Sequence, residues 1–184
     1  MADPGVPDAT NDATNDATND AAAGAALRAG LATTGLMAGL FGVFDVVVMP
    51  ALARSGDQDF VTRMRRINRA IENPVFGVVY VGALVAPAAA TVLLRRAGHR
   101  RAARWAAGAL ACYGAAVAVT SAVNLPLNAR LARTADPGSA RRGFERPWNR
   151  ANMLRTATSA AAVACLARAL GLMPGRVRGP DGRG

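Results

Sequence analysis

The chain has 184 residues, of which 52% are apolar and 5% aromatic, and its formal net charge at pH 7 is +10. All 22 strongly basic residues are arginines, which lie in clusters between long apolar runs. Such clusters are typical of membrane-protein loops that meet lipid headgroups, so we expect membrane lipid as a partner and no nucleic acid.

The first 24 residues form a region of their own. They contain the repeat DATNDATNDATND, which is acidic and poor in large apolar side chains. A segment of this composition cannot bury enough apolar surface to become ordered. We therefore expect a disordered acidic tail at 1–24, a membrane domain at 25–174 and a disordered basic tail at 175–184.

Four apolar runs follow, at roughly 26–49, 75–94, 105–125 and 152–173. Each is about as long as the ~20 residues that a helix needs to cross the hydrocarbon layer of a membrane. Helices of a soluble bundle would carry polar faces at the helical period, and these runs mostly lack such faces. The sequence therefore predicts an all-α fold, a four-helix transmembrane up-down bundle in the cell membrane. In the first run, Gly35, Ala38, Gly39 and Gly42 are spaced for close helix packing in lipid.

The connections between these runs differ in character. Residues 57–72 have an apolar stripe at helical spacing and are expected to form an amphipathic helix on the membrane surface. That stripe consists of Phe60, Met64, Ile67 and Ile71. Residues 95–104, RRAGHRRAAR, carry five arginines and no acid, which favours the cytoplasm for this loop and for both termini. The opposite connections also carry many arginines, so the arginine count alone leaves the orientation open.

The polar side chains of the apolar runs lie near the ends of those runs. In an up-down bundle the end of one helix lies beside the start of the next, so these side chains fall at one membrane face. They are Asp45, Asn73, Asn124, Asn128, Trp148, Asn149, Asn152 and Arg155, whereas His99 falls at the opposite face. Polar groups inside a membrane are costly unless they are paired. The cluster therefore indicates either a functional site or a structural network in which Asp45 pairs with Arg155 and the amides cap helix ends.

Several chemistries are disfavoured by the sequence. No His/Cys cluster has the spacing of a metal site, and no glycine-rich phosphate loop follows a strand. A Ser-His-Asp triad lacks its histidine, because His99 falls at the wrong face. These observations disfavour a metal site, a phosphate-binding loop and a serine triad.

Four motifs occur in an order that resembles the anthrone-oxygenase-like family of small four-span membrane proteins. They are GLMAGLFGVFDVVVMPALARS, MRRINRAIENPVF, VNLPLNARLA and WNRANMLRT, and the resemblance covers about residues 30–160. It implies an enzyme of aromatic polyketide tailoring, in antibiotic or other secondary metabolism, that converts an anthrone to an anthraquinone with O₂ as co-substrate and no metal or flavin. The chain departs from the family pattern at Asp45, where a small residue is usual, and at Met153, where histidine is common.

For the reaction that the resemblance implies, we hypothesise a role for each residue of the polar cluster. Asp45 is the expected base that removes a proton from the substrate. Asn124, Asn128, Asn152 and Arg155 are the expected donors to the resulting oxyanion. The expected substrate-binding residues are Tyr113 and Trp148, which offer aromatic faces, together with Asn73 and Thr156.

Two other functions stay open at this point. The bundle could serve as a membrane scaffold or small-molecule-binding protein without catalysis, or as a small-solute carrier that uses Asp45 and Arg155. The sequence also leaves a homo-oligomer open.

Overall fold

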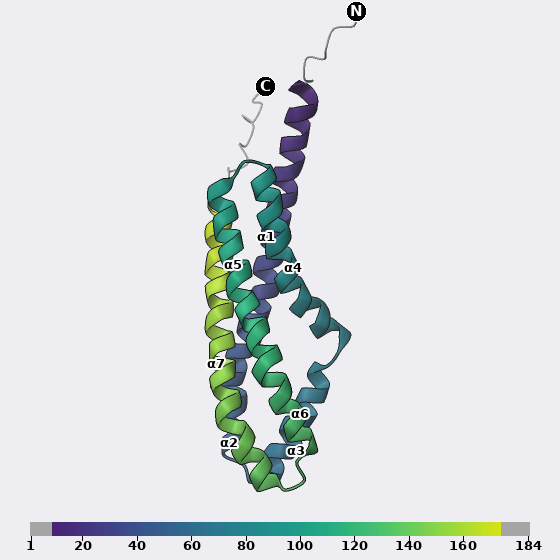
Figure 1. The fold of residues 1–184 in the computed structure, drawn as a ribbon, viewed down its shortest axis with the longest axis vertical. Coiled ribbons are helices and arrows are strands. Elements are labelled where there is room, and N and C mark those ends of the chain that lie inside the picture. Colours follow the sequence, from purple (N-terminus) through teal and green to yellow (C-terminus); the bar gives the residue numbers. More distant parts are fainter. Residues whose placement is uncertain (1–8, 174–184) are drawn as a thin grey trace, which may run out of the picture.

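The computed structural model describes residues 9–173, and every regular element in that range is helical (Figure 1). The long helices are α1 (Ala9–Val43), α4 (Pro74–Arg96), α5 (Arg100–Val119) and α7 (Pro137–Leu170). The short elements are the π-helical turns η1 (Phe44–Val48) and η2 (Thr120–Asn124) and the helices α2 (Met49–Ala53), α3 (Asp57–Ile71) and α6 (Leu125–Arg133). The prediction of an all-α fold is confirmed for the described residues.

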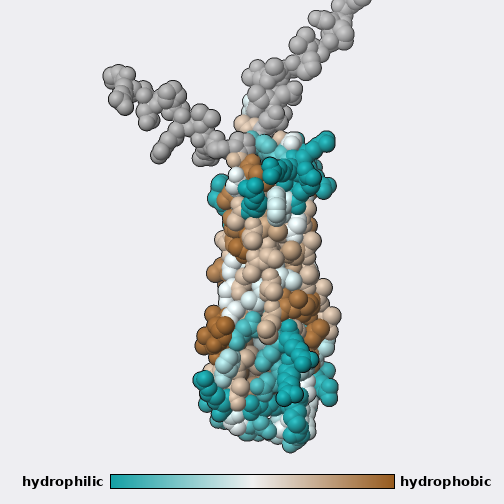
Figure 2. Space-filling view, turned by 90° about the vertical axis from the view of Figure 1, so that its left-hand side faces the viewer, coloured by the Kyte–Doolittle hydropathy of each residue, from teal (hydrophilic) through white to brown (hydrophobic). Residues whose placement is uncertain are grey.

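The long helices pack side by side into an elongated molecule. Helix α1 packs on α4 and α7, and α5 packs on the same two helices. Three continuous helical stretches are long and apolar enough to cross a membrane, namely Ala17–Ala53, Pro74–Arg96 and Arg100–Arg133. The chain therefore has the helices of a membrane protein, and an apolar band lies between two polar ends of its surface (Figure 2).

Helix α7, which contains the fourth apolar run, is not among these three stretches. Its polar side chains lower the mean hydropathy of the helix, yet the structure turns several of them inward. Asn152 and Ser159 are fully buried and Arg155 is 7% exposed, whereas the neighbouring Met153 and Leu154 are exposed. Between residues 152 and 159 the helix thus buries three polar side chains and exposes two large apolar ones.

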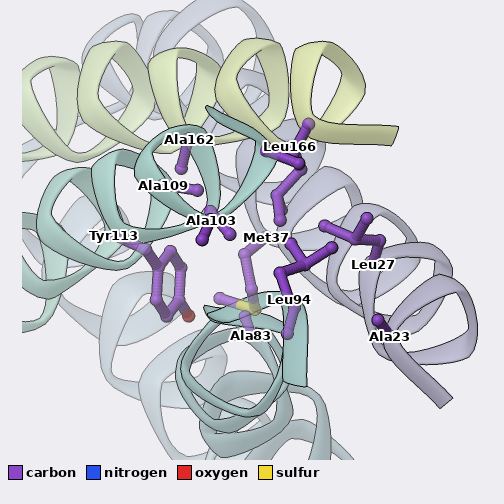
Figure 3. Close-up of a cluster of buried hydrophobic side chains, with 14 of the residues drawn as sticks. Ala23, Leu27, Met37, Ala83, Leu94, Ala103, Ala109, Tyr113, Ala162 and Leu166 are labelled. Carbon is purple, nitrogen blue, oxygen red and sulfur yellow. The ribbon is translucent and has the colours of Figure 1, made fainter. Parts of the chain in front are cut away.

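The core between the long helices is rich in alanine, which lets the backbones approach closely (Figure 3). Gly30 and Gly82 mark the tightest crossings: a Cβ at Gly30 would lie 3.4 Å from Leu166, and one at Gly82 would lie 3.3 Å from Thr33. By contrast, no atom of the described residues lies within 4 Å of where a Cβ at Gly35 or Gly39 would be. These two glycines therefore do not lie at a close helix crossing of the described chain, and their packing in lipid stays a prediction.

A second apolar core lies at the end of the molecule formed by α2, α3, α6 and the start of α7. It contains Phe44, Met49, Leu52, Phe60, Val61, Met64, Leu131, Ala140, Phe144 and Trp148. The expected amphipathic helix forms as α3, but its apolar stripe packs into this core instead of lying on a membrane surface, because neighbouring helices supply the apolar surface that it needs. Phe60 and Met64 are fully buried, and Ile67 and Ile71 pack against the cluster.

Two arginines hold this end of the molecule together. Arg141 of α7 donates to the carbonyl oxygens of Ala53 and Ser55, both at 2.8 Å, and its guanidinium lies over the ring of Phe60. Arg65 of α3 donates to the carbonyl oxygens of Leu131 and Thr134 at the end of α6. Each planar guanidinium satisfies helix-end carbonyls that would otherwise lack partners.

The N-terminal region differs from the expected disordered tail, because residues 9–24 continue helix α1. Ala23 and Leu27 are fully buried against the bundle, and Asp20 lies 2.7 Å from His99 at the start of α5. A helix that is already held by packing extends at little further cost, since nucleation is the expensive step. The expected basic tail at 175–184 lies outside the described residues.

Candidate functional site

Two π-helical turns carry polar residues of the candidate site. Asp45 lies in η1, and Asn124 lies in η2. Each turn is closed by a backbone bond over five residues, from the N–H of Met49 to Phe44 and from that of Leu125 to Thr120. A proline follows each turn by two positions, Pro50 in α2 and Pro126 in α6.

The prolines explain why the helices widen at these places. A proline lacks the N–H that an α-helix needs, and its ring collides with the carbonyl group four residues earlier. A π turn inserts one extra residue, moves that carbonyl aside and lets the helix continue. The sequence therefore places a local irregularity of the backbone directly at Asp45 and Asn124.

Asn152 of α7 is the centre of a buried hydrogen-bond network. Its amide nitrogen donates to the carbonyl oxygen of Phe41 at 2.8 Å and to the Asp45 carboxylate at 2.6 Å. Its amide oxygen accepts from Arg155 at 2.5 Å. Thr156 donates to the other oxygen of Asp45 at 2.6 Å. The expected direct pairing of Asp45 with Arg155 is thus replaced by a contact through Asn152, because an amide can donate and accept at once.

Beside this network lies a cavity of about 130 Å³ between α1, α3, α4, α7 and η2. Four aromatic side chains line it, Phe41, Phe44, Phe76 and Trp148, together with Leu40, Asn68, Ile71, Glu72, Thr120, Asn124, Leu125, Asn128 and Arg155. We refer to it as the aromatic cavity. Its wall combines flat apolar surfaces with a few polar groups, which is typical of a small-molecule site.

Arg155 and Asn124 are the buried polar groups of the aromatic cavity. The Arg155 guanidinium lies over the rings of Phe41 and Trp148, at 4.3 Å and 5.4 Å from their centroids. Asn124 is 1% exposed, and within residues 9–173 neither its amide nitrogen nor its amide oxygen has a hydrogen-bond partner. Because buried amides are nearly always paired, the unpaired Asn124 amide makes the aromatic cavity a candidate site for a ligand that can form hydrogen bonds.

Asn128 connects the aromatic cavity to a wider groove outside it. Its side-chain oxygen accepts a hydrogen bond of 3.0 Å from the indole N–H of Trp148. The outer groove has a volume of about 660 Å³ and shares four lining residues with the cavity, Asn68, Glu72, Leu125 and Asn128. These shared residues define the mouth of the aromatic cavity.

Other residues that the sequence singled out lie elsewhere. Tyr113 is fully buried in the bundle core and donates to the carbonyl oxygen of Tyr80 at 3.2 Å. Asn73 is exposed and caps α4 by accepting from the N–H of Phe76 at 3.0 Å. Asp45 and Thr156 line a separate surface groove between η1, α2 and α7, not the aromatic cavity.

The sequence reasoning missed several residues that line the aromatic cavity. Phe41 and Phe44 were part of an apolar run, in which nothing distinguishes a cavity wall from ordinary core. Asn68 and Glu72 are four residues apart and therefore share one face of α3, which was a usable signal. The apolar stripe of the same helix is the stronger pattern, and it predicts a different face of α3 as the important one.

The comparison with known proteins bears on this site. The anthrone oxygenase family model matches residues 71–165, just over half of the chain. The chain belongs to the anthrone oxygenase family. The resemblance that the sequence motifs indicated is thereby confirmed.

The matched segment of this anthrone oxygenase family member carries much of the aromatic cavity. Phe76, Asn124, Asn128, Trp148 and Arg155 lie inside it, whereas the residues from α1 and most of α3 precede it. No curated protein and no solved structure gives a significant match to the chain. Residues 9–173 contain no group of three or more His, Cys, Asp or Glu side chains placed to hold a metal ion.

Proposed function

We propose that the protein is an integral membrane oxygenase that converts an anthrone-type aromatic compound to the corresponding quinone with O₂, without a cofactor. Family membership supports this reaction class. The observation that carries the proposal is the pair of Arg155 and the unpartnered Asn124 amide in an aromatic-lined cavity. Aromatic walls suit a flat substrate, and the two donors suit an oxygen that gains negative charge.

The reaction needs little from the protein beyond positioning and proton transfer. Removal of a proton from the methylene group leaves an anion whose charge spreads onto the carbonyl oxygen. The anion reacts with O₂: the methylene carbon loses both hydrogens, one oxygen atom becomes the new carbonyl oxygen, and the other leaves as water. Donors fixed before the reaction stabilise such an oxyanion most strongly in a water-poor site, which is the role we propose for Arg155 and Asn124.

The size of the cavity suggests how a three-ring substrate would lie. An apolar protein cavity of about 150 Å³ holds one benzene molecule. The aromatic cavity, at about 130 Å³, therefore has room for roughly one ring, and the remaining rings would extend through the mouth into the outer groove.

The proposal includes four crossings of the cell membrane, with both termini on the cytoplasmic side. Three stretches have the required length and hydropathy. For α7, the support is that Met153 and Leu154 are exposed whereas the polar Asn152, Arg155 and Ser159 are buried. This part of α7 therefore offers an apolar surface to lipid. The arginine-rich loop at 95–104 supports the orientation.

The test is O₂ consumption by the purified protein in detergent, with emodin anthrone as substrate, a chelator present and no flavin added. We expect uptake well above the spontaneous rate. Asn124→Ala and Arg155→Ala should each lower the rate by about 10²–10³-fold, the usual cost of losing an oxyanion donor. Leu154→Ala, next to Arg155 but exposed, serves as the matched control and should keep the rate.

Two results would contradict the proposal. Wild-type uptake no faster than the spontaneous reaction, with anthrone bound, would indicate a binding protein without catalysis. Full activity in both the Asn124 and Arg155 variants would remove the aromatic cavity from the reaction.

A further inference from the structure

The proposed reaction needs a group at the aromatic cavity that accepts a proton from the substrate. Asp45, the base expected from the sequence, lies on the far side of Asn152 and lines a different groove. Among the described residues that line the aromatic cavity, Glu72 is the one that carries a carboxylate.

The backbone at Glu72 is held by two helix ends. Glu72 ends α3, and its N–H donates to the carbonyl oxygen of Asn68 at 3.3 Å. The next residue, Asn73, caps α4. Within residues 9–173 the carboxylate itself forms no ion pair within 4 Å, unlike that of Glu145, which binds Arg141. The two helix ends therefore hold the backbone of Glu72 in place, and its carboxylate stays available to a substrate.

Glu72 and Arg155 occupy different depths of the cavity. Glu72 is exposed and lines both the cavity and the outer groove, so it lies at the mouth. Arg155 is 7% exposed and Asn124 is 1% exposed, and both line the cavity but not the outer groove. The acid thus lies at the mouth of the aromatic-lined space, and the oxyanion donors lie in its buried part.

This separation matches the geometry of an anthrone. Its carbonyl group and its acidic methylene group lie on opposite edges of the central ring. A substrate whose carbonyl oxygen points to Arg155 and Asn124 therefore directs its methylene group towards the mouth. A carboxylate next to the outer groove can also release the acquired proton to water.

We propose that Glu72 is the catalytic base, an inference that rests on the proposed function. Its carboxylate accepts one methylene proton, and the electron pair of the broken C–H bond stays on the substrate and spreads onto the carbonyl oxygen held by Arg155. O₂ then takes up the electrons of this anion and forms a bond to the methylene carbon, and the resulting substrate hydroperoxide receives one proton. Loss of the second methylene proton breaks the O–O bond, so that one oxygen atom becomes the new carbonyl oxygen and the other leaves with two protons as water.

The test separates proton transfer from oxygen chemistry. Without O₂ and in D₂O, the base exchanges the methylene hydrogens of a bound anthrone for deuterium, which NMR follows. Glu72→Gln should lower both the catalysed exchange and the aerobic O₂ uptake by about 10²–10³-fold, within the range for loss of a general base. The affinity of the Glu72→Gln variant for the anthrone should equal that of the wild type. Asp59→Asn, on the same helix but outside the cavity and the groove, should match the wild type.

A rescue experiment excludes a merely structural role. In Glu72→Ala, added acetate can enter through the mouth and replace the missing carboxylate, so exchange should rise with acetate concentration, but not in the wild type. The assignment would be overturned if both Glu72 variants exchanged the methylene hydrogens at the wild-type rate. It would also be overturned if Glu72→Ala lost exchange and acetate did not restore it. Either result would leave the oxygenase proposal intact. If the wild type catalyses neither exchange nor O₂ uptake, the proposed function fails and this inference fails with it.

Discussion

At the scale of single residues, the network around Asn152 shows how the Asp45 carboxylate and the Arg155 guanidinium are joined without contacting each other. Asn152 donates to Asp45 and accepts from Arg155, and it ties both to α1 through the carbonyl oxygen of Phe41. A direct ion pair would leave fewer donors for a ligand. Instead the guanidinium donates to the Asn152 amide oxygen at 2.5 Å and to the Thr120 hydroxyl at 3.5 Å, and the Arg155 Nε has no hydrogen-bond partner within residues 9–173.

Replacement of Asn152 tests this role. In Asn152→Leu the half-buried Asp45 and the buried Arg155 each lose a partner, so we expect the free energy of unfolding to fall by about 2–5 kcal/mol. The measurement is unfolding of the detergent-solubilised protein. Ser159→Ala is the matched control on the same helix, because its buried hydroxyl has no partner in the described part of the chain, and its removal should cost little. Equal stability of the two variants would refute the account of Asn152.

At the scale of elements, the two π turns coincide with polar residues of the candidate site. Both π turns are followed by a proline, and each carries a polar residue that an uninterrupted α-helix would orient differently. One inserted residue rotates everything that follows by about 100° around the helix axis, which is one residue of an α-helix. The turn at η2 therefore decides which residues of α6, including Asn128, line the cavity.

Pro126→Ala separates the role of this turn from stability. Without the proline ring the backbone can return to α-helical bonding, so we expect retained or slightly raised thermal stability together with at least about tenfold slower turnover, because Asn124 and Asn128 would rotate relative to each other. O₂ uptake and thermal unfolding are measured together. Pro147→Ala, at an exposed helical position in α7 without a π turn, is the control and should keep its activity. Unchanged turnover in Pro126→Ala would show that the π turn does not position the site.

At the scale of the whole molecule, two apolar cores hold different sets of helices together. The alanine-rich core joins the long helices, and the larger side chains of the second core fix α2, α3, α6 and the start of α7 at one end. The aromatic cavity lies where the two meet, since Phe41 belongs to the first core and Phe44 and Trp148 to the second.

The proposed topology predicts where the connections lie. Single cysteines at Ala97 and Ala135, in a background without Cys112 and Cys165, should react with a membrane-impermeant reagent from opposite sides of the membrane. Four crossings and the arginine bias favour the cytoplasmic side for position 97. Labelling of both positions from one side would rule out α5 as a crossing. Labelling of position 97 from outside would reverse the orientation.

The sequence by itself determined the helical fold, the positions of the long apolar helices, the amphipathic character of residues 57–71 and the family. These properties follow from hydropathy, period and local motifs, which depend on neighbours along the chain. The sequence also indicated which polar residues lie at one end, because connectivity alone brings those helix ends together.

Only the tertiary structure decided what those residues contact. It placed Asn152 between Asp45 and Arg155, left Asn124 without a partner among residues 9–173, packed the apolar stripe of α3 against other helices, and brought Glu72 to the aromatic cavity. The reason is physical: which face of a helix meets which neighbour depends on helix rotation. A single π turn changes that rotation by about 100°, and no local pattern encodes the partner on the other side.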